Sequence, residues 1–541
     1  AGFTVKEETG PEDEGVDLVV DARFLGVADT GAQAALTATR ELAATLRTVP
    51  SGTVYAVLAE DSQEQAPVRE ALWGMLAALE TEDTGRRLLR VALADGAGAA
   101  EAAAALAARA DGSSDTRLRV TPDKVQVARL VRHDDRPEEP VSTGGAALIT
   151  GGTGALGLSV ARWLAGRGVD DITLMARSAP DATAREVIDR LTADGTTVRV
   201  VSGSATDPDD CARALTEAST DAPLHHVFHL AGTTADGAFH RMDDDAFGKV
   251  FAAKAAGADR IAEAAAGHPL RSFVLFSSVS SCLGAAGQTN YAAANGYLNG
   301  LATALRARGI PATAVAWGPW EPGDKGGLAA DAQARAALER AGLRPLTDQE
   351  AWPVLAASSP GGEPVTVAVA ADFTRYAERL GTHPAARLVE DLVLPATGSA
   401  ESGDHEGMEE GWLRARLAES DDRHDLLRDA VREAVGAVLG AHDGITDREG
   451  FADLGMDSIM VIDLRGRLGH ALDLDLPSTI GLDHPTVEAM ARYLEGLLPG
   501  QTPAPAPEPV SSGGGAPIGD LSELSTEDLV AAARAEMMSG E

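Results

Sequence analysis

Short runs of apolar residues alternate with segments of helical periodicity over the first two thirds of the chain, and the alternation starts twice. In the first series the apolar runs lie at 16–21, 53–59 and 88–93, and the helical segments lie at 31–47, 65–80 and 98–109. In the second series the apolar runs lie at 146–150, 172–176, 198–202, 225–230, 272–276 and 312–317, with helix-length segments between them. Parallel strands need long crossover connections, usually helices, so this pattern is typical of parallel sheets. We therefore predict an α/β fold with two doubly wound subdomains.

The pattern changes after residue 410, where helical periodicity continues without runs of strand type. A small all-α domain of the four-helix type should follow. Its main helices are predicted over 421–440, 458–470 and 486–497. Segments 395–410 and 499–519 lack apolar periodicity, and the second is rich in Pro, Gly and Ser, so we expect both to be linkers. The tail over 520–541 should contain one short helix and is a candidate docking element.

Composition excludes several classes of protein. The chain has 541 residues, too many for one core, and 82 acidic residues against 46 basic ones give a net charge of −36. A nucleic-acid partner is excluded because binding a nucleic-acid backbone, with its many phosphates, needs a basic face. No apolar run is long enough for a membrane span, and the opening AGFTVKEETG lacks a secretory signal. Only Cys211 and Cys282 occur, so we expect no disulfide framework, no metal site and a cytoplasmic protein.

A glycine-rich turn follows the first apolar run of the second series and precedes a helix. Small residues there let the backbone approach a pyrophosphate, and the free N–H groups of the helix N-terminus favour an anion. The cofactor-binding candidates are Gly151, Gly152, Thr153, Gly154, Leu156 and Gly157. An ordinary tight turn is the alternative interpretation. The next strand ends before Arg177 rather than before Asp or Glu, and an arginine suits a ribose 2′-phosphate, so NADP(H) is favoured over NAD(H).

Four polar residues further along the chain form a candidate catalytic set. Ser278 follows the apolar run 272–276, and Tyr291 and Asn295 lie one helical turn apart on one face. The phenol of Tyr291 would exchange protons poorly at neutral pH unless a cation lay beside it. Lys254, in the predicted helix before the apolar run 272–276, is the candidate cation.

Residues 1 to 394 resemble the ketoreductase of a modular type I polyketide synthase. Such a ketoreductase is a short-chain dehydrogenase/reductase. The resemblance rests on TGGTGALG (150–157), HLAG (229–232), FSSVSS (276–281), YAAAN (291–295) and AWGPW (316–320), with REALWGMLAALETED (69–83) in the first subdomain. It implies two Rossmann-like subdomains: a structural one over 1–140 that binds no cofactor and a catalytic one over 141–394 that binds NADPH.

The resemblance also implies a role for each residue of the set. Ser278 hydrogen-bonds the ketone, Tyr291 protonates the developing alkoxide, Lys254 holds the ribose and makes the tyrosine a better acid, and Asn295 supports the proton relay. Ser204 stands where the family commonly has an Asp that reaches the adenine, so its contact there should be weaker or missing.

Stereochemistry is a further expectation from the family. Its B-type members carry a Leu-Asp-Asp loop, whereas A-type members place a Trp eight residues before the tyrosine. Here the loop is Thr234-Ala235-Asp236 and the other position is Leu283. These stereocontrol positions favour B-type reduction to a D-configured β-hydroxyl, and a solvated turn is the alternative for Asp236.

Residues 411–498 resemble an acyl carrier protein. FADLGMDSIMV (451–461) places an Asp-Ser pair at a helix start, and DHPTVEAMARYL (483–494) opens the last helix. The family's modified serine maps onto Ser458, which implies a covalent 4′-phosphopantetheine. An isolated serine at this place would usually be a helix cap. Segment 421–498 carries 16 acidic and seven basic residues, a surface suited to basic patches on partner enzymes.

These resemblances predict a fragment of a polyketide synthase that reduces a carrier-bound β-ketoacyl thioester with NADPH. The chain opens without an initiator Met, as expected for a fragment. Expected partners are the acyl chain on its carrier, ketosynthase and acyltransferase domains of the same assembly line, and a phosphopantetheinyl transferase. Two alternatives are a non-reducing scaffold whose only active part is the carrier and a free-standing NADPH ketone reductase.

Overall fold

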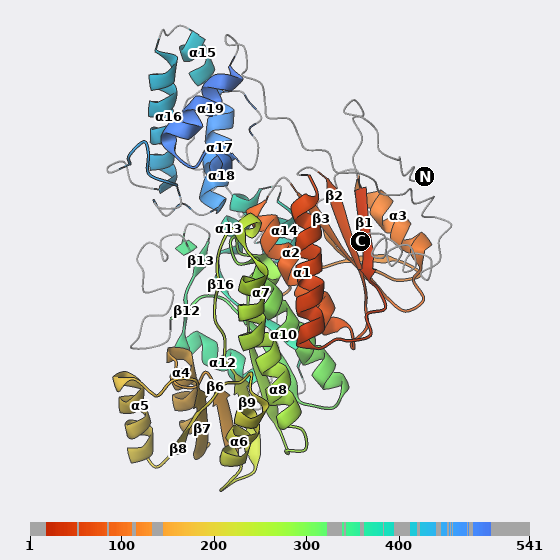
Figure 1. The fold of residues 1–541 in the computed structure, drawn as a ribbon, viewed down its shortest axis with the longest axis vertical. Helices are drawn as coiled ribbons and strands as arrows, with labels where there is room; N and C mark the ends of the chain where they lie inside the picture. The colour runs from red at the N-terminus through yellow and green to blue at the C-terminus, as the bar shows by residue number, and fades with distance from the viewer. Residues whose placement is uncertain are drawn as a thin grey trace. The chain divides into compact units, whose positions relative to one another are not determined.

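A computed structural model describes most of the chain. The described residues are 18–50, 53–83, 86–110, 115–132, 144–321, 338–339, 342–357, 362–381, 383–393, 412–418, 422–439, 445–451, 454, 456, 458–472, 474, 476 and 480–498. The predicted linkers over 395–410 and 499–519 and the predicted tail helix over 520–541 lie outside them. The chain divides into two compact units (Figure 1). Residues 18–393, apart from 81–86, belong to the first, and residues 412–498 belong to the second.

The first sheet has the strand order β1-β2-β3-β4-β5. Its strands are β1 (Leu18–Phe24), β2 (Val54–Glu60), β3 (Arg87–Leu93), β4 (Arg117–Val120) and β5 (Val125–Val127). The first four strands are parallel and β5 returns antiparallel to β4. The connecting helices are α1 (Ala32–Thr48), α2 (Ala66–Glu82) and α3 (Ala99–Ala110). The predicted strand–helix alternation is confirmed here, and the β4–β5 hairpin is an addition to it.

The second sheet has seven parallel strands in the order β15-β11-β10-β9-β6-β7-β8. Its strands are β6 (Ala146–Thr150), β7 (Asp171–Ala176), β8 (Thr197–Ser202), β9 (Leu224–His229), β10 (Ser272–Ser278), β11 (Ala312–Trp317) and β15 (Val365–Ala368). The order reverses between β6 and β9, and a doubly wound sheet binds its ligand at the carboxyl ends of the strands at such a reversal.

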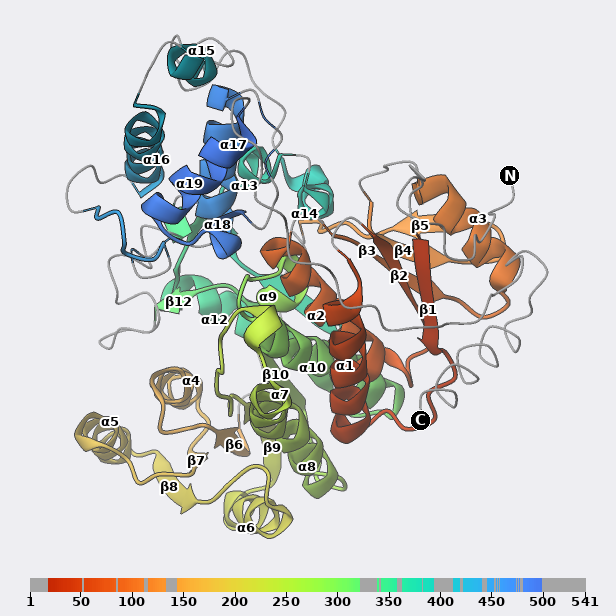
Figure 2. The same cartoon turned by 45° about the horizontal axis from the view of Figure 1, so that its top comes forward.

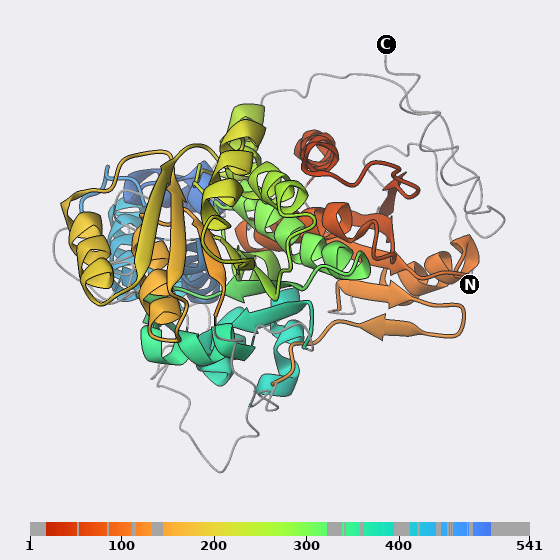
Figure 3. The same ribbon diagram turned by 90° about the horizontal axis from the view of Figure 1, so that it is seen from below.

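Helices cover both faces of this sheet (Figure 3). On one face lie α4 (Ala155–Ala165), α5 (Ala182–Ala193) and α12 (Asp348–Ala357). On the other lie α6 (Pro208–Ala218), α7 (Asp244–Phe251), α8 (Gly257–Ala264) and α10 (Thr289–Ala307). A π-turn, η2 (Ala252–Ala256), joins α7 to α8. Successive residues of one strand point to opposite faces of the sheet. In β6, Ile149 packs with the helices of the first face and Leu148 with those of the other.

Shorter elements complete the first unit. They are η1 (Phe239–Arg241), α9 (Ser280–Leu283), β12 (Trp320–Glu321), β13 (Leu343–Arg344), β14 (Leu346–Thr347), β16 (Ala370–Ala371), α13 (Phe373–Leu380), α14 (Pro384–Leu388) and η4 (Glu390–Leu392).

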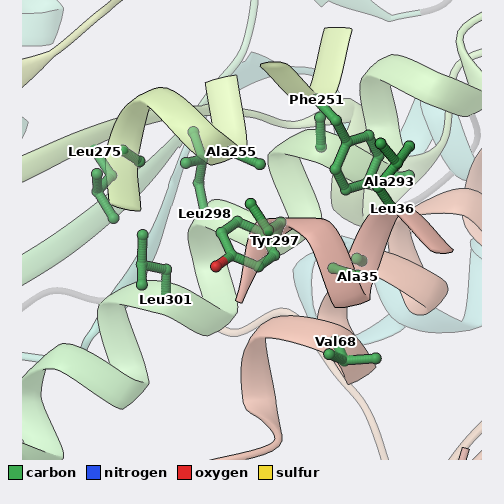
Figure 4. Packing of buried hydrophobic residues seen from close by; sticks show 14 of the residues in the cluster. Ala35, Leu36, Val68, Phe251, Ala255, Leu275, Ala293, Tyr297, Leu298 and Leu301 are labelled. Carbon is green, nitrogen blue, oxygen red and sulfur yellow. The ribbon is translucent and has the colours of Figure 1, made fainter. Parts of the chain in front are cut away.

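One hydrophobic cluster joins the two sheets' helices. It contains Ala35 and Leu36 of α1 and Val68 of α2 together with Tyr297 and Leu298 of α10 (Figure 4). Figure 2 shows α1 and α2 beside α10. Glycines allow the closest approach, because a Cβ on Gly296 or Gly300 of α10 would overlap backbone carbonyl groups of α2. The two subdomains therefore share a core.

The second unit is a helical bundle. Its helices are α15 (Trp412–Ala418), α16 (Arg423–Leu439), α17 (Ser458–Leu472), α18 (Ile480–Asp483) and α19 (Val487–Leu497). The three predicted helices are confirmed as α16, α17 and α19. Val431, Leu464 and Leu494 from these helices are fully buried in one cluster, which α15 joins through Leu413 and Leu417. Thr486 caps α19, since its side chain accepts from the N–H of Ala489 at 3.1 Å.

Candidate active site

The glycine-rich turn lies between β6 and α4, at the reversal of strand order. Gly151 has φ +68°, a left-handed conformation that favours glycine. A Cβ on Gly152 would lie 2.7 Å from the carbonyl oxygen of Ile149, and one on Gly157 would lie 2.6 Å from that of Gly151. Side chains at these positions would collide with the turn's own backbone, so the tight packing of the turn depends on glycine.

The N-terminus of α4 is open toward this turn. Gly154 is its N-cap, with no side-chain cap, and the first turn carries no acidic residue. Thr153 and Leu156 are half-buried, and Leu156 packs against the sheet cluster. Free N–H groups and the positive end of the helix dipole make this turn suitable for a phosphate.

Arg177 and Ser204 lie beyond the carboxyl ends of β7 and β8, the two strands on one side of β6. Arg177 is exposed directly after β7 and makes no hydrogen bond or ion pair with another described residue. Ser204 follows β8 and is half-buried. Its hydroxyl lies 2.8 Å from that of Thr206, and its N–H donates to Asp210 at 2.8 Å. The guanidinium of Arg177 is thus available to a ligand, whereas the hydroxyl of Ser204 already has a partner within the loop.

Lys254 and Tyr291 approach each other from two helical elements. Lys254 lies in the π-turn and is only 5% exposed. Its Nζ donates to the carbonyl of Phe276 in β10 at 3.0 Å and lies 5.2 Å from the centroid of the Tyr291 ring. Tyr291 is half-buried in the first turn of α10, and its hydroxyl bonds to none of the residues that the structure describes. The ammonium thus lies over the face of the Tyr291 ring.

Ser278 and Asn295 belong to the same region. Ser278 ends β10, and its Oγ accepts from the N–H of Ser280 at 3.2 Å and from the hydroxyl of Ser280 at 3.0 Å. Its own proton remains free to donate. Asn295 is fully buried; its Nδ2 donates to the carbonyl of Tyr291 at 2.8 Å, and its carbonyl accepts from Ser277 at 3.0 Å. The side-chain Oδ1 of Asn295 has no partner among the described residues, an acceptor suited to a ligand or water.

Ser280 and His229 are two further residues of the site that were not among the predicted ones. Ser280 orients the hydroxyl of Ser278, and the repeated serines of 276–281 were its only signal. His229 is fully buried; its Nδ1 lies 2.9 Å from Thr150 Oγ1 and its Nε2 lies 3.0 Å from the carbonyl of Lys254. Burial, with the positive charge of Lys254, lowers the pKa of His229 to about 4.

The two predicted stereocontrol positions lie in different surroundings. Asp236 is exposed, and its carboxylate accepts from Nε2 of Gln288 at 2.9 Å, three residues before Tyr291. The N–H of Gly237 donates to the carbonyl of Gly287 at 2.8 Å, which fixes the loop to the start of α10. Leu283 is buried in a small cluster with Tyr376, Leu388 and Val389.

In the second unit, Ser458 is the first residue of α17. Two described residues before it are held by backbone bonds, since Met456 N–H donates to the carbonyl of Phe451 at 2.8 Å and Phe451 N–H donates to the carbonyl of Pro485 at 2.7 Å. Met456 is buried in the core of the bundle. The backbone thus presents Ser458 at a helix start, where a phosphate is favoured.

The fold and these residues define a two-part protein, an α/β reductase of the short-chain type and a helical carrier. Comparison with known families agrees. The KR domain family matches residues 145–322, and the phosphopantetheine attachment site family matches residues 429–494. The chain belongs to the ketoreductase and carrier region of the modular polyketide synthases.

Individual relatives lead to the same family. The spectinabilin polyketide synthase system protein NorA of Streptomyces orinoci is 34% identical over 532 residues, which are 93% of this chain and 26% of that protein. Polyketide synthase GfsA of Streptomyces halstedii is 34% identical over 79% of this chain and 6% of its own length. The chain therefore spans a small part of these curated relatives.

Solved structures match the first unit. The first ketoreductase of the tylosin polyketide synthase is 30% identical, with a TM-score of 0.59, over 69% of this chain and 82% of that chain. A-type ketoreductases from a modular polyketide synthase are 28% identical, with a TM-score of 0.59, over 66% of this chain and 77% of that chain. Within the described residues, no helix has the length and hydropathy to cross a bilayer, and no cluster of His, Cys, Asp and Glu could hold a metal.

Proposed function

We propose that this chain reduces a β-ketoacyl thioester on its carrier to the β-hydroxyacyl thioester with NADPH. The observation that carries the proposal is the buried ammonium of Lys254, 5.2 Å from the ring of Tyr291 and bonded to the strand that ends at Ser278. A cation beside a free phenol is the arrangement that general acid catalysis needs.

Each residue of the site has a chemical task in this proposal. The hydroxyl of Ser278, held by Ser280, donates its free proton to the ketone oxygen. Tyr291 protonates the oxygen as negative charge develops on it, and Lys254 stabilises the phenolate that results. Asn295 binds the carbonyl of Tyr291. Its Oδ1, which has no partner among the described residues, accepts a hydrogen bond from the group or water that returns a proton to Tyr291.

The residues around the glycine turn fit a dinucleotide. Gly151, Gly152 and Gly157 allow the tight turn, and the uncapped start of α4 offers its N–H groups to a pyrophosphate. The unpaired guanidinium of Arg177 suits a 2′-phosphate, which favours NADPH. When bound, the nicotinamide supplies the hydride. Ser204 contributes little to adenine binding, because its hydroxyl is engaged with Thr206.

The second unit carries the acyl chain in this proposal. Ser458 takes a 4′-phosphopantetheine arm from a phosphopantetheinyl transferase, and the arm's thiol holds the substrate as a thioester. Its place at the start of α17 supports this assignment, because the helix N-terminus stabilises the phosphate. Tethering raises the effective concentration of substrate at the reductase. Ketosynthase and acyltransferase domains of an assembly line are the proposed further partners.

The proposed domain boundaries follow the sequence analysis. They are 1–140, 141–394 and 411–498 for the structural, catalytic and carrier parts, with linkers over 395–410 and 499–519 and a tail over 520–541.

The proposed product has the B-type, D-configured hydroxyl. Its support is Asp236, which Gln288 holds at the start of the helix that carries Tyr291, and the leucine at position 283. Chiral chromatography of the product released from the carrier tests this assignment, and a mainly L-configured alcohol contradicts it.

One experiment separates the proposal from a non-reducing scaffold. The chain is incubated with coenzyme A and a phosphopantetheinyl transferase, loaded with a β-ketoacyl group, and given NADPH. We expect a mass gain on the carrier, then a further gain of two hydrogens on the acyl group. Loading without reduction supports the scaffold instead, and reduction of small free ketones at an equal kcat/KM supports a free-standing reductase.

A further inference from the structure

The carbonyl of Lys254 has a side-chain partner from a neighbouring strand. From this contact we propose that His229 is a positioning residue that holds the main chain of Lys254 in the π-turn and so keeps its ammonium beside Tyr291. The inference rests on the proposed role of Lys254 and adds to it a residue that touches neither substrate nor cofactor.

The hydrogen-bond chain through His229 has only one direction. The carbonyl of Lys254 can only accept, so Nε2 of His229 carries the proton. A neutral imidazole with its proton on Nε2 has an unprotonated Nδ1, so the hydroxyl of Thr150 donates to Nδ1 at 2.9 Å, and Thr150 Oγ1 itself accepts from the backbone N–H of Ala231 at 3.2 Å. The imidazole is neutral and both its nitrogens have partners, which agrees with a pKa lowered to about 4.

Within the π-turn this carbonyl already accepts one backbone hydrogen bond, and His229 adds a second donor from outside the helix. In η2 the N–H of Gly257 bonds to the carbonyl of Ala252, five residues back, and also to that of Lys254. A π-turn departs from the regular pattern of helical hydrogen bonds and often occurs at functional sites. The Nε2–H of His229 gives the carbonyl of Lys254 a second donor, from β9, and so links the π-turn to the sheet.

Two glycines close the space around these groups. A Cβ on Gly257 would lie 3.2 Å from Cε1 of His229, and a Cβ on Gly232 would lie 3.0 Å from Cε of Lys254. Thr150 and His229 are fully buried and Lys254 is 5% exposed. The imidazole and the lysine stem therefore have little freedom, and the last residue of β6 is linked to the ammonium through one rigid path.

Both the location and the bonding of His229 argue against a direct role in chemistry. Its ring is fully buried, and each nitrogen is occupied by an internal group. Any effect of His229 on reduction must therefore pass through Lys254 or through the glycine turn that follows Thr150.

Two variants test the contact in the full chain. His229→Phe keeps a ring but removes both hydrogen bonds, whereas His229→Gln keeps an amide N–H that can reach the carbonyl of Lys254. His226→Phe is the matched control, because His226 is equally buried in the same strand and bonds to Ser272 instead, at 2.9 Å. Amide hydrogen exchange over 252–257, without cofactor, reports the π-turn itself.

We expect His229→Phe to raise exchange over 252–257 by about 10-fold or more, the effect of a lost buried hydrogen bond. His229→Gln should restore most of the protection, and His226→Phe should leave this segment unchanged. Equal exchange in His229→Phe and the wild type overturns the proposal, as does an equal rise in His226→Phe. If His229→Phe does not fold, Thr150→Val, which removes the donor to Nδ1, is compared with His229→Gln. Lower protection of segment 252–257 in Thr150→Val supports the proposal. Equal protection of this segment in the two variants overturns it.

A double-mutant cycle with Lys254→Met then tests whether His229 acts through Lys254. We expect His229→Phe to lower kcat/KM about 10-fold in the wild-type background and less than 2-fold in the Lys254→Met background. Equal losses in both backgrounds contradict the positioning role. If the wild type shows no NADPH-dependent reduction while the exchange results hold, the proposed function fails and the structural link between His229 and the π-turn stands.

Discussion

Gly74 in α2 lies against the backbone of Ala292 in α10, so closely that a Cβ on Gly74 would overlap the carbonyl oxygen of Ala292 and lie 2.9 Å from its carbonyl carbon. Ala292 is the residue after Tyr291. The first subdomain thus fixes the helix turn that presents the proposed acid.

Gly74→Ala should destabilise the first unit and lower reduction. Alanine is preferred over glycine within a helix by about 1 kcal/mol, but the overlap forces α2 and α10 apart at a cost of about 1–3 kcal/mol. We expect a net loss of stability in denaturant titration and a fall in kcat as Tyr291 moves. Gly496→Ala, a helical position with open space in the second unit, is the control and should not lower reduction. Unchanged stability and kcat in Gly74→Ala contradict the role of this contact.

Tyr291→Phe should lower reduction by at least ~10²-fold, the lower range for lost acid–base catalysis. Steady-state kinetics and NADPH binding are the measurements, and binding should change little. Tyr297→Phe on the same helix is the matched control. Its hydroxyl bonds to Asp259 at 2.7 Å, so its loss should lower stability by about 1–3 kcal/mol without the same loss of kcat. Wild-type turnover in Tyr291→Phe refutes the assignment.

Arg177→Ala should weaken NADPH more than NADH, because only NADPH carries the 2′-phosphate that an arginine binds. The ratio of kcat/KM for the two cofactors measures the effect. Arg190→Ala removes an exposed arginine whose ion pair is with Glu186 of its own helix, and it should leave the ratio unchanged. Equal losses for both cofactors in Arg177→Ala indicate a structural role for that arginine.

Ser458→Ala should abolish the mass gain after phosphopantetheinylation, because the variant lacks the hydroxyl that attacks coenzyme A. Reduction of a diffusible β-ketoacyl thioester by the same variant should be unchanged. Intact mass and NADPH consumption are measured on one preparation. A persisting mass gain shows that another residue is modified.

The pH dependence of stability should carry the signature of His229. Its pKa is about 4 in the folded chain and about 6.5 when exposed, so the unfolded chain binds the proton more readily between these values. The resulting contribution, about 3 kcal/mol, is complete above pH 6.5 and is lost as the pH falls toward 4. The free energy of unfolding of the wild type relative to His229→Gln should therefore fall over this range. A constant difference shows that His229 titrates normally.

The long strands were predictable and the short edge strands were not. Strand β10, Ser272–Ser278, contains four consecutive apolar residues, 273–276, buried on both faces, which leave a clear signal in the sequence. Strand β15, Val365–Ala368, has four mostly half-buried residues, and its pairing with Ala314 to Trp317 defines it. Helix α12 contains Pro353, a residue that argues against a helix interior from sequence alone.

The same distinction holds in the site. The spacing of Tyr291 and Asn295 placed them on one helical face because that relationship is local. The contact of His229 with Thr150 joins residues 79 positions apart, and it exists because β9 pairs with β6 rather than with β8. Strand order is decided by packing of the whole sheet, so no local pattern indicates this contact.

The core shared by the two subdomains sets a rule for building hybrid synthases. Because Ala35, Val68 and Tyr297 pack in one cluster, and Gly296 and Gly300 match the backbone of α2, the interface is a fitted surface rather than a hinge between modules. Exchanging the catalytic half alone would pair that surface with a foreign helix. A reductase that is transferred into another synthase should therefore include both subdomains, from β1 to the last turn near residue 393.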